Sequence, residues 1–249
     1  MEEIIRLLIE KGNNLFNNER EFVEFTHNRE PDELLNNLED YPQAFLIACI
    51  CDRQYPAEKV WEIPYHLKER LQQDFSFENL ATKSKDEFVS LMQNPTSLHR
   101  FSNKFGEIIY LAIQKVITDY NNNPANIWND NPSSAELIFR LLSFYGVGIK
   151  IATMTANILV RNYKISVTDK FSIDISPDVQ VKRVFTRLGL VQNKPSDEEV
   201  IYKARSMNPQ YPGIFDLSCW EIGRNWCKPR IPLCAQCPLN NHCPKVGIN

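Results

Sequence analysis

Glycine is scarce in this sequence, with 8 residues in 249, whereas glycine makes up about 7% of an average protein. No apolar run approaches the roughly 18 residues that a membrane-spanning helix needs. The chain begins with the acidic Met1-Glu2-Glu3, so we expect neither a secretory signal nor a transit peptide. These shortages favour a mostly helical protein with short connections and no membrane segment.

Cysteine is present in an odd number, seven, and three of the seven are scattered: Cys49, Cys51 and Cys219. An odd count with unpatterned members favours a reducing, intracellular compartment, which is the cytoplasm with its nucleoid if the source is prokaryotic. The other four, Cys227, Cys234, Cys237 and Cys243, have the spacing C-x6-C-x2-C-x5-C.

Four thiols within seventeen residues match no helix or strand period, so they indicate a metal centre. Tetrahedral zinc usually takes two C-x2-C knuckles, and only Cys234 and Cys237 form one here. The wide flanks therefore favour a [4Fe–4S] cluster over zinc. A pair of disulfides and four unrelated thiols are the metal-free alternatives.

The net charge of −3 hides an asymmetry along the chain. Residues 1–40 carry eleven acids and four bases, so the remaining 209 residues have a net charge of +4. Bases gather in two groups, at Lys182, Arg183 and Arg187 and again at Arg224, Lys228 and Arg230. A local basic face is enough to contact phosphates, because charge interactions are screened within roughly 8–10 Å; ordinary solvated surface is the alternative.

Most of the chain has helical patterning. Three S-x-x-E capping boxes predict helix starts at Ser84, Ser133 and Ser196, and residues 103–120 carry apolar side chains at helical spacing. The exception is 164–175, where apolar and polar residues alternate. That period of two predicts a short β-hairpin.

Two glycines lie within three residues, in Gly146-Val147-Gly148 between two helical segments. Such a helix–hairpin–helix turn can expose backbone N–H groups to a phosphate, although many similar turns only connect helices. Lys150 follows in the first turn of the second helix, as an amine nucleophile or a surface lysine. Asp178 precedes another helix, as a carboxylate with a chemical role or a simple N-cap.

In this order and combination, the motifs resemble the helix–hairpin–helix (HhH-GPD) DNA glycosylase superfamily, in its endonuclease III-like iron–sulfur branch. The likeness spans roughly residues 43–245. The hairpin with Lys150 and the four cysteines match the family's motifs, and Asp178 matches its catalytic aspartate. Residues 181–184 look like those of adenine-mismatch glycosylases, and 46–48 with Gln54 match the segment whose glutamine fills the gap left by a flipped nucleotide.

The resemblance implies an all-α fold of two lobes. A six-helix lobe would cover 43–171, and an iron–sulfur lobe would combine 1–42 with 172–249. Lys150 and Asp178 would be catalytic, with Asp174 a rival for the aspartate role. The implied DNA contacts are Gln54, Lys104, Gly146, Val147, Gly148, Lys182, Arg183, Lys228 and Arg230.

The resemblance also implies an activity: a monomer that binds double-stranded DNA, flips a damaged or mismatched base and removes it. A lysine at position 150 favours a glycosylase that also cleaves the abasic strand through a Schiff base. A glycosylase that uses water instead, and a non-catalytic DNA-binding iron–sulfur protein, are the alternatives. The sequence does not identify the lesion.

Overall fold

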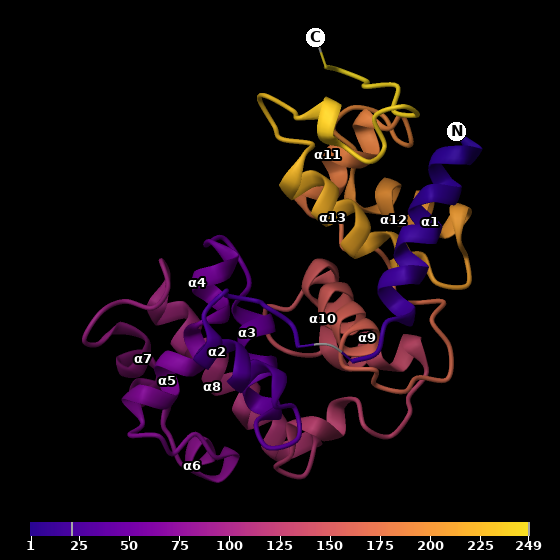
Figure 1. Ribbon diagram of the computed structural model, residues 1–249. Helices are drawn as coiled ribbons and strands as arrows, with labels where there is room; N and C mark the ends of the chain where they lie inside the picture. Colours follow the sequence, from indigo (N-terminus) through magenta and orange to yellow (C-terminus); the bar gives the residue numbers. More distant parts are fainter. Residues whose placement is uncertain (21, 249) are drawn as a thin grey trace. The chain divides into compact units, whose positions relative to one another are not determined.

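The computed structural model describes residues 1–20 and 22–248. All regular structure within these ranges is helical, which confirms the predicted all-α class (Figure 1). No helix in this part of the chain is long and apolar enough to cross a bilayer. The elements are α1 (Glu2–Asn17), α2 (Arg29–Asn36), α3 (Pro42–Cys51), α4 (Ala57–Trp61), α5 (Ile63–Arg70), α6 (Phe77–Ala81), α7 (Lys85–Gln93), α8 (Ser102–Asp119), α9 (Ser134–Leu142), α10 (Ile149–Arg161), α11 (Val179–Arg187), α12 (Asp197–Met207) and α13 (Asp216–Asn225), with short 3-10 turns η1 (Pro124–Ile127), η2 (Pro212–Phe215) and η3 (Cys234–Gln236).

The chain divides into two compact units, each discontinuous in sequence. The central unit comprises residues 21–131 and 139–151, and the terminal unit comprises 1–20, 132–138 and 152–249. The two lobes expected from the family resemblance, 43–171 and 1–42 with 172–249, stay a prediction about domains.

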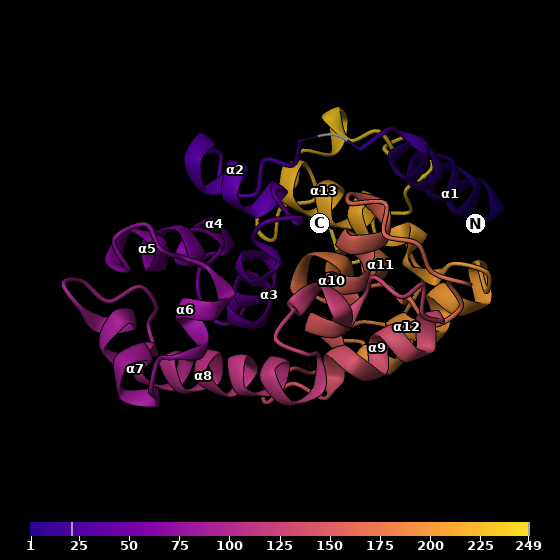
Figure 2. The same cartoon turned by 90° about the horizontal axis from the view of Figure 1, so that it is seen from below.

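The core of the central unit is built around α3. All ten residues of this helix are buried, as expected of a helix that is apolar on every side. It packs against α2, α4, α5, α8 and η1, and α2 and α4 lie beside it in both views (Figures 1 and 2). The buried helix anchors the turn that follows it, whose residue Gln54 is exposed.

Helices α7 and α8 lie side by side in the central unit (Figures 1 and 2). Their close approach depends on Gly106 of α8, because a Cβ atom there would lie 2.6 Å from Cα of Val89. The predicted helix at 103–120 is confirmed, with observed bounds Ser102–Asp119.

In the terminal unit, α11 packs against α13, and α1 packs against α13 and η2. Gly223 of α13 allows the first of these contacts, because an added Cβ would lie 2.8 Å from Cβ of Gln180. The helix pair matters for the site because Asp178 lies at the start of α11 and the four spaced cysteines follow the end of α13.

The predicted capping boxes at Ser84 and Ser196 are confirmed in full, with reciprocal bonds to Glu87 and Glu199. At the third predicted start, the Ser133 hydroxyl accepts a hydrogen bond from Glu136 N at 3.1 Å. Local side-chain chemistry therefore fixes these three helix starts.

The predicted β-hairpin at 164–175 is wrong, because the described chain forms no strand there. Side-chain bonds replace a strand ladder in this segment. The Asp169 carboxylate accepts hydrogen bonds from the Ser134 hydroxyl and from Phe171 N, and the Ser134 hydroxyl in turn accepts from Ser172 N at 3.0 Å. The apolar alternation instead buries Ile173 and Ile175 in the terminal unit.

Candidate active site and metal centre

The helix–hairpin–helix turn is formed as predicted, between the end of α9 at Leu142 and the start of α10 at Ile149. Val147 N donates to Phe144 O at 3.0 Å, and Gly146 has a φ of +77°, where a side chain would be strained. Gly148 is different: an added Cβ would meet nothing within 4 Å, and its φ is not in the left-handed region. The fold without DNA thus explains why residue 146 is glycine but gives no reason for a glycine at position 148.

Lys150 is the second residue of α10 and is half-buried in the central unit. The same unit places Asp52, at the end of α3, within electrostatic reach of it. Burial raises the pKa of the Asp52 carboxyl group, and the positive charge of Lys150 opposes this rise. Sequence reasoning missed Asp52, because only tertiary packing brings the two groups together.

Two further predicted DNA contacts belong to the central unit. Gln54 is exposed and has a φ of +54°, a left-handed conformation unusual for a residue with a side chain. Lys104 is exposed in the first turn of α8, after the loop that carries the partly exposed ring of Phe101.

Asp178 is the N-cap of α11 in the terminal unit, and its Oδ1 accepts a hydrogen bond from Val181 N at 2.7 Å. The backbone just before it is held firmly, because Ser176 N donates to the buried carboxylate of Asp216 at 2.8 Å. The rival Asp174 is itself buried and forms an ion pair with Arg205. The N-cap role of Asp178 leaves its chemical role a separate question.

The backbone of Asp174 is anchored from α10. Nδ2 of Asn157 donates to Asp174 O at 2.7 Å and to Thr153 O at 3.0 Å, and its Oδ1 accepts from the hydroxyl of Tyr211 at 2.9 Å. Asn157 is fully buried. A polar residue on an otherwise apolar helix face is the sequence signal for this anchor.

The four predicted basic contacts of the terminal unit differ in their surroundings. Lys182 forms an ion pair with Asp197 at 2.5 Å. Arg183 donates to the carbonyls of Cys227 at 2.6 Å and Gly223 at 2.9 Å, so it binds the beginning of the cysteine loop to α11. The remaining two, Lys228 and Arg230, are exposed on that loop, and the ammonium of Lys228 donates to Arg224 O.

The four spaced cysteines line one small cavity of the terminal unit. Among residues 1–20 and 22–248, no three His, Cys, Asp or Glu side chains come close enough together to hold a single metal ion. The donors around the sulfurs fit thiolate ligands: Nη1 of Arg187 lies 3.3 Å from Sγ of Cys227, and Lys245 N lies 3.4 Å from Sγ of Cys243. Positive and N–H groups beside sulfur stabilise the deprotonated ligands of a metal centre.

Arg187 belongs to the basic group noted in the sequence, and the structure shows that it organises the cysteine loop. Besides its contact with Cys227, the Arg187 guanidinium donates to Lys228 O at 2.6 Å and to Pro229 O at 2.9 Å, and the Arg187 carbonyl accepts from Val246 N at 3.1 Å. Both ends of the cysteine loop are therefore fastened to one residue of α11.

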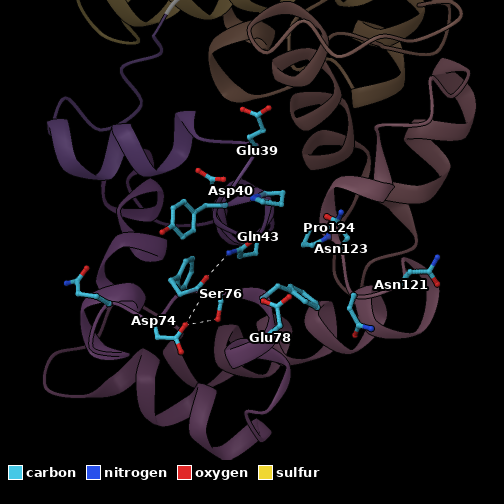
Figure 3. Close-up of a pocket in the computed structure, with 15 residues that line it drawn as sticks. Glu39, Asp40, Gln43, Asp74, Ser76, Glu78, Asn121, Asn123 and Pro124 are labelled. Atoms are coloured by element: carbon cyan, nitrogen blue, oxygen red, sulfur yellow. Dashed lines mark hydrogen bonds between the residues drawn. The ribbon is translucent and has the colours of Figure 1, made fainter.

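The central unit also has an open pocket formed by residues 39–43, 73–78 and 121–124. Figure 3 shows the carboxylates of Glu39, Asp40, Asp74 and Glu78 around it. Of the described residues that line this pocket, none belongs to the predicted site. An acidic lining repels phosphate, so the predicted DNA contacts and this pocket are electrostatically distinct.

No protein-family model matches the chain. Endonuclease III of Thermotoga maritima is 31% identical over 112 residues, which are 45% of this chain and 46% of that protein. Human adenine DNA glycosylase is 32% identical over 71 residues, 26% of this chain and 13% of that protein. The matched part thus spans less than half the length of either relative.

Solved structures extend the likeness to nearly the whole chain. A trapped covalent intermediate of endonuclease III with DNA superposes with a TM-score of 0.63 at 21% identity, covering 98% of this chain and 96% of that one. A thermostable thymine-DNA glycosylase gives a TM-score of 0.64 at 17% identity, covering 98% and 97%. The chain therefore has the fold of the helix–hairpin–helix DNA glycosylase superfamily. In sequence, the likeness is to endonuclease III and, over a shorter stretch, to adenine DNA glycosylase.

Proposed function

We propose that this protein is a DNA base-excision repair glycosylase that also cleaves abasic sites as a lyase. The observation that carries the proposal is the position of Lys150, in the first turn of α10 directly after a glycine hairpin, within a fold shared with DNA glycosylases. An amine nucleophile is what distinguishes a lyase from a glycosylase that activates water.

Gly148 supports the phosphate-binding part of this proposal. Its glycine is not required by backbone conformation or by neighbouring atoms in the free fold. A missing Cβ at an exposed turn before a helix N-terminus suits close approach of a DNA phosphate to the backbone N–H groups. The target base is unreachable inside a duplex, so the nucleotide is flipped out and Gln54 occupies the vacated stack.

The chemistry runs in three steps. Nζ of Lys150 forms a bond to C1′ of the flipped nucleotide while the C1′–N bond to the base breaks, and the base leaves with that electron pair and takes up a proton. The sugar ring then opens to a Schiff base with Lys150. Loss of a C2′ proton expels the 3′ phosphate by β-elimination. The Asp178 carboxylate stabilises the developing positive charge at the sugar and accepts the proton of the attacking amine.

The four cysteines would hold a [4Fe–4S] cluster. Its contribution when bound would be structural: to fix the loop between Cys227 and Cys243, which presents Lys228 and Arg230 to DNA phosphates. Arg183 and Arg187 support that loop from α11 through backbone carbonyls and one sulfur. The proposed partner is double-stranded DNA with a damaged or mismatched base.

The proposal is tested by incubating the purified, iron-loaded protein with duplexes that each carry one lesion, or one abasic site, at a defined position. We expect base release from at least one lesion and cleavage of the abasic strand 3′ to the site. Base release without strand cleavage would identify the water-using glycosylase instead. Binding to these duplexes without either reaction would identify a non-catalytic DNA-binding protein.

A further inference from the structure

Arg53 connects the turn after α3 to the glycine hairpin. Its guanidinium donates from Nη1 to Gly146 O and from Nη2 to Ile50 O at 3.0 Å, and it lies over the ring of Phe105 at 5.1 Å. The next residue, Gln54, has the left-handed conformation described above. One side chain of the central unit thus links the hairpin carbonyl to the end of α3.

His99 fastens the same turn from the other side. Phe101 N donates to Nδ1 of His99 at 3.0 Å, so Nδ1 is the acceptor and Nε2 carries the proton that is donated to Arg53 O at 3.0 Å. The ring is buried, with the ring of Phe105 at 3.9 Å and that of Tyr55 at 5.0 Å. These two bonds require the neutral imidazole.

Three separate segments therefore meet at Arg53: the turn with Gln54, the loop 99–101 and the hairpin at Gly146. This arrangement lowers the stability of the folded state. Nε of Arg53 is buried and has no acceptor among the described residues, and burial lowers the pKa of this guanidinium. Most buried donors in native proteins are paired, so an unpaired one calls for an explanation other than stability.

We infer that Arg53 is a positioning residue that holds Gln54 and the hairpin in a fixed relation, with neutral His99 locking the turn. The DNA role of this assembly rests on the proposed function. The hairpin would bind a phosphate while Gln54 entered the gap in the base stack, so their fixed spacing would distinguish a flipped nucleotide from intact duplex. None of the three segments holds this spacing by secondary structure alone.

Protonation of His99 would break the hydrogen bond from Phe101 N, because Nδ1 would then carry a proton that points at the N–H of Phe101. Arg53 and Arg100 are the charged groups that act on the ring, Tyr55 is the titratable ring packed on it, and burial lowers the pKa of His99 below its ordinary value. The discrimination between damaged and intact duplex is therefore expected to fall at acid pH.

The test compares Arg53→Lys, which keeps the charge but loses the two-pronged geometry, with Arg70→Lys as matched control. Arg70 also donates to two backbone carbonyls, of Leu91 and of Thr96 at 2.7 Å, but contacts neither the hairpin nor Gln54. Affinity is measured for a duplex with one stable abasic analogue and for the intact duplex. Hydrogen exchange is measured over residues 143–151, which include the Val147 amide bonded to Phe144 O.

We expect Arg53→Lys to lower the ratio of abasic to intact affinity about tenfold, as for loss of one charge-assisted hydrogen bond, and to speed exchange of the hairpin. Arg70→Lys should leave both unchanged. A ratio and an exchange rate equal to wild type in Arg53→Lys would overturn the inference. Absence of any reaction in the wild type would contradict the proposed function alone. The role of Arg53 in holding the hairpin would still be tested, because the exchange measurement needs no DNA.

A pH series gives the second readout. The affinity ratio of the wild type should fall only as the pH approaches the lowered pKa of folded His99, which lies below the ordinary histidine value of about 6.5, and His99→Gln should remove this dependence. A ratio that stays constant with pH in the wild type would count against His99 as the lock.

Discussion

The Asp174 carboxylate is held by Arg205 through two parallel hydrogen bonds, Nε to Oδ1 and Nη2 to Oδ2, each of 2.8 Å. Asp174 is buried, and both of its oxygens are engaged in this pair. The geometry favours a structural role for Asp174 and leaves Asp178 as the better candidate for the aspartate of the proposed reaction.

Asparagine substitutions separate these roles. Asp178→Asn should keep the melting temperature, because asparagine is about as good an N-cap as aspartate, but should reduce base release about a hundredfold or more. Asp178→Ala should in addition lower the free energy of unfolding by about 1 kcal/mol through loss of the cap. Full activity in a well-folded Asp178→Asn protein would remove Asp178 from the mechanism.

Asp174→Asn is expected to behave in the opposite way. It breaks a buried charged pair and should lower the free energy of unfolding by about 1.5–3 kcal/mol, measured by urea unfolding. At a temperature where the variant is folded, its rate of base release should stay within a few-fold of wild type. A stable but inactive Asp174→Asn protein would reverse the assignment.

Two glycine-to-alanine changes distinguish packing from ligand approach. Gly106→Ala should destabilise the protein by about 1–3 kcal/mol, because the new methyl group would lie 2.6 Å from Cα of Val89. Gly148→Ala should leave the melting temperature unchanged, since nothing lies within 4 Å of the added Cβ, yet weaken duplex binding. Unchanged binding by Gly148→Ala would argue against phosphate contact at this turn.

The seven cysteines should fall into two classes of reactivity. Cys49, Cys51 and Cys219 are buried, and burial raises the pKa of Cys51 to about 12, so their thiols should resist maleimide in the folded protein. The four loop cysteines are partly exposed and should be labelled only after iron is removed with a chelator. Labelling located by mass spectrometry checks this, and equal reactivity of all seven would contradict it.

His99 should also make stability depend on pH. Because burial lowers the pKa of folded His99, the unfolded chain binds the proton more readily below about pH 6.5. The free energy of unfolding should therefore be full above this pH and decrease as the pH falls toward the folded pKa. Comparing urea unfolding of wild type and His99→Gln isolates this contribution, which should vanish in the variant.

The sequence could predict features set by local chemistry. The capping serines at 84 and 196 and the hairpin glycine Gly146 follow rules that depend on neighbouring residues, and the structure confirms them. The four-cysteine spacing likewise identified a loop that lines one cavity.

Features that depend on tertiary contacts could not be predicted from the sequence. The alternation at 164–175 is indistinguishable from a strand until Ser134, thirty-five residues away from Asp169, is seen to bind that loop. Arg53 and His99 belong to no recognisable spacing, because their partners come from three segments. The sequence predicts Arg183 as a DNA contact but does not show that its guanidinium also donates to the carbonyls of Gly223 and Cys227.

Borohydride reduction of the iron-loaded protein on a duplex with a single abasic site tests the central claim most directly. The account predicts a covalent protein–DNA adduct whose linkage maps to Lys150 by mass spectrometry. The adduct should be lost in Lys150→Ala and also in Lys150→Arg, which keeps the charge but cannot form a Schiff base. No adduct from folded, iron-loaded wild type, or an adduct that persists in both variants, would contradict the account.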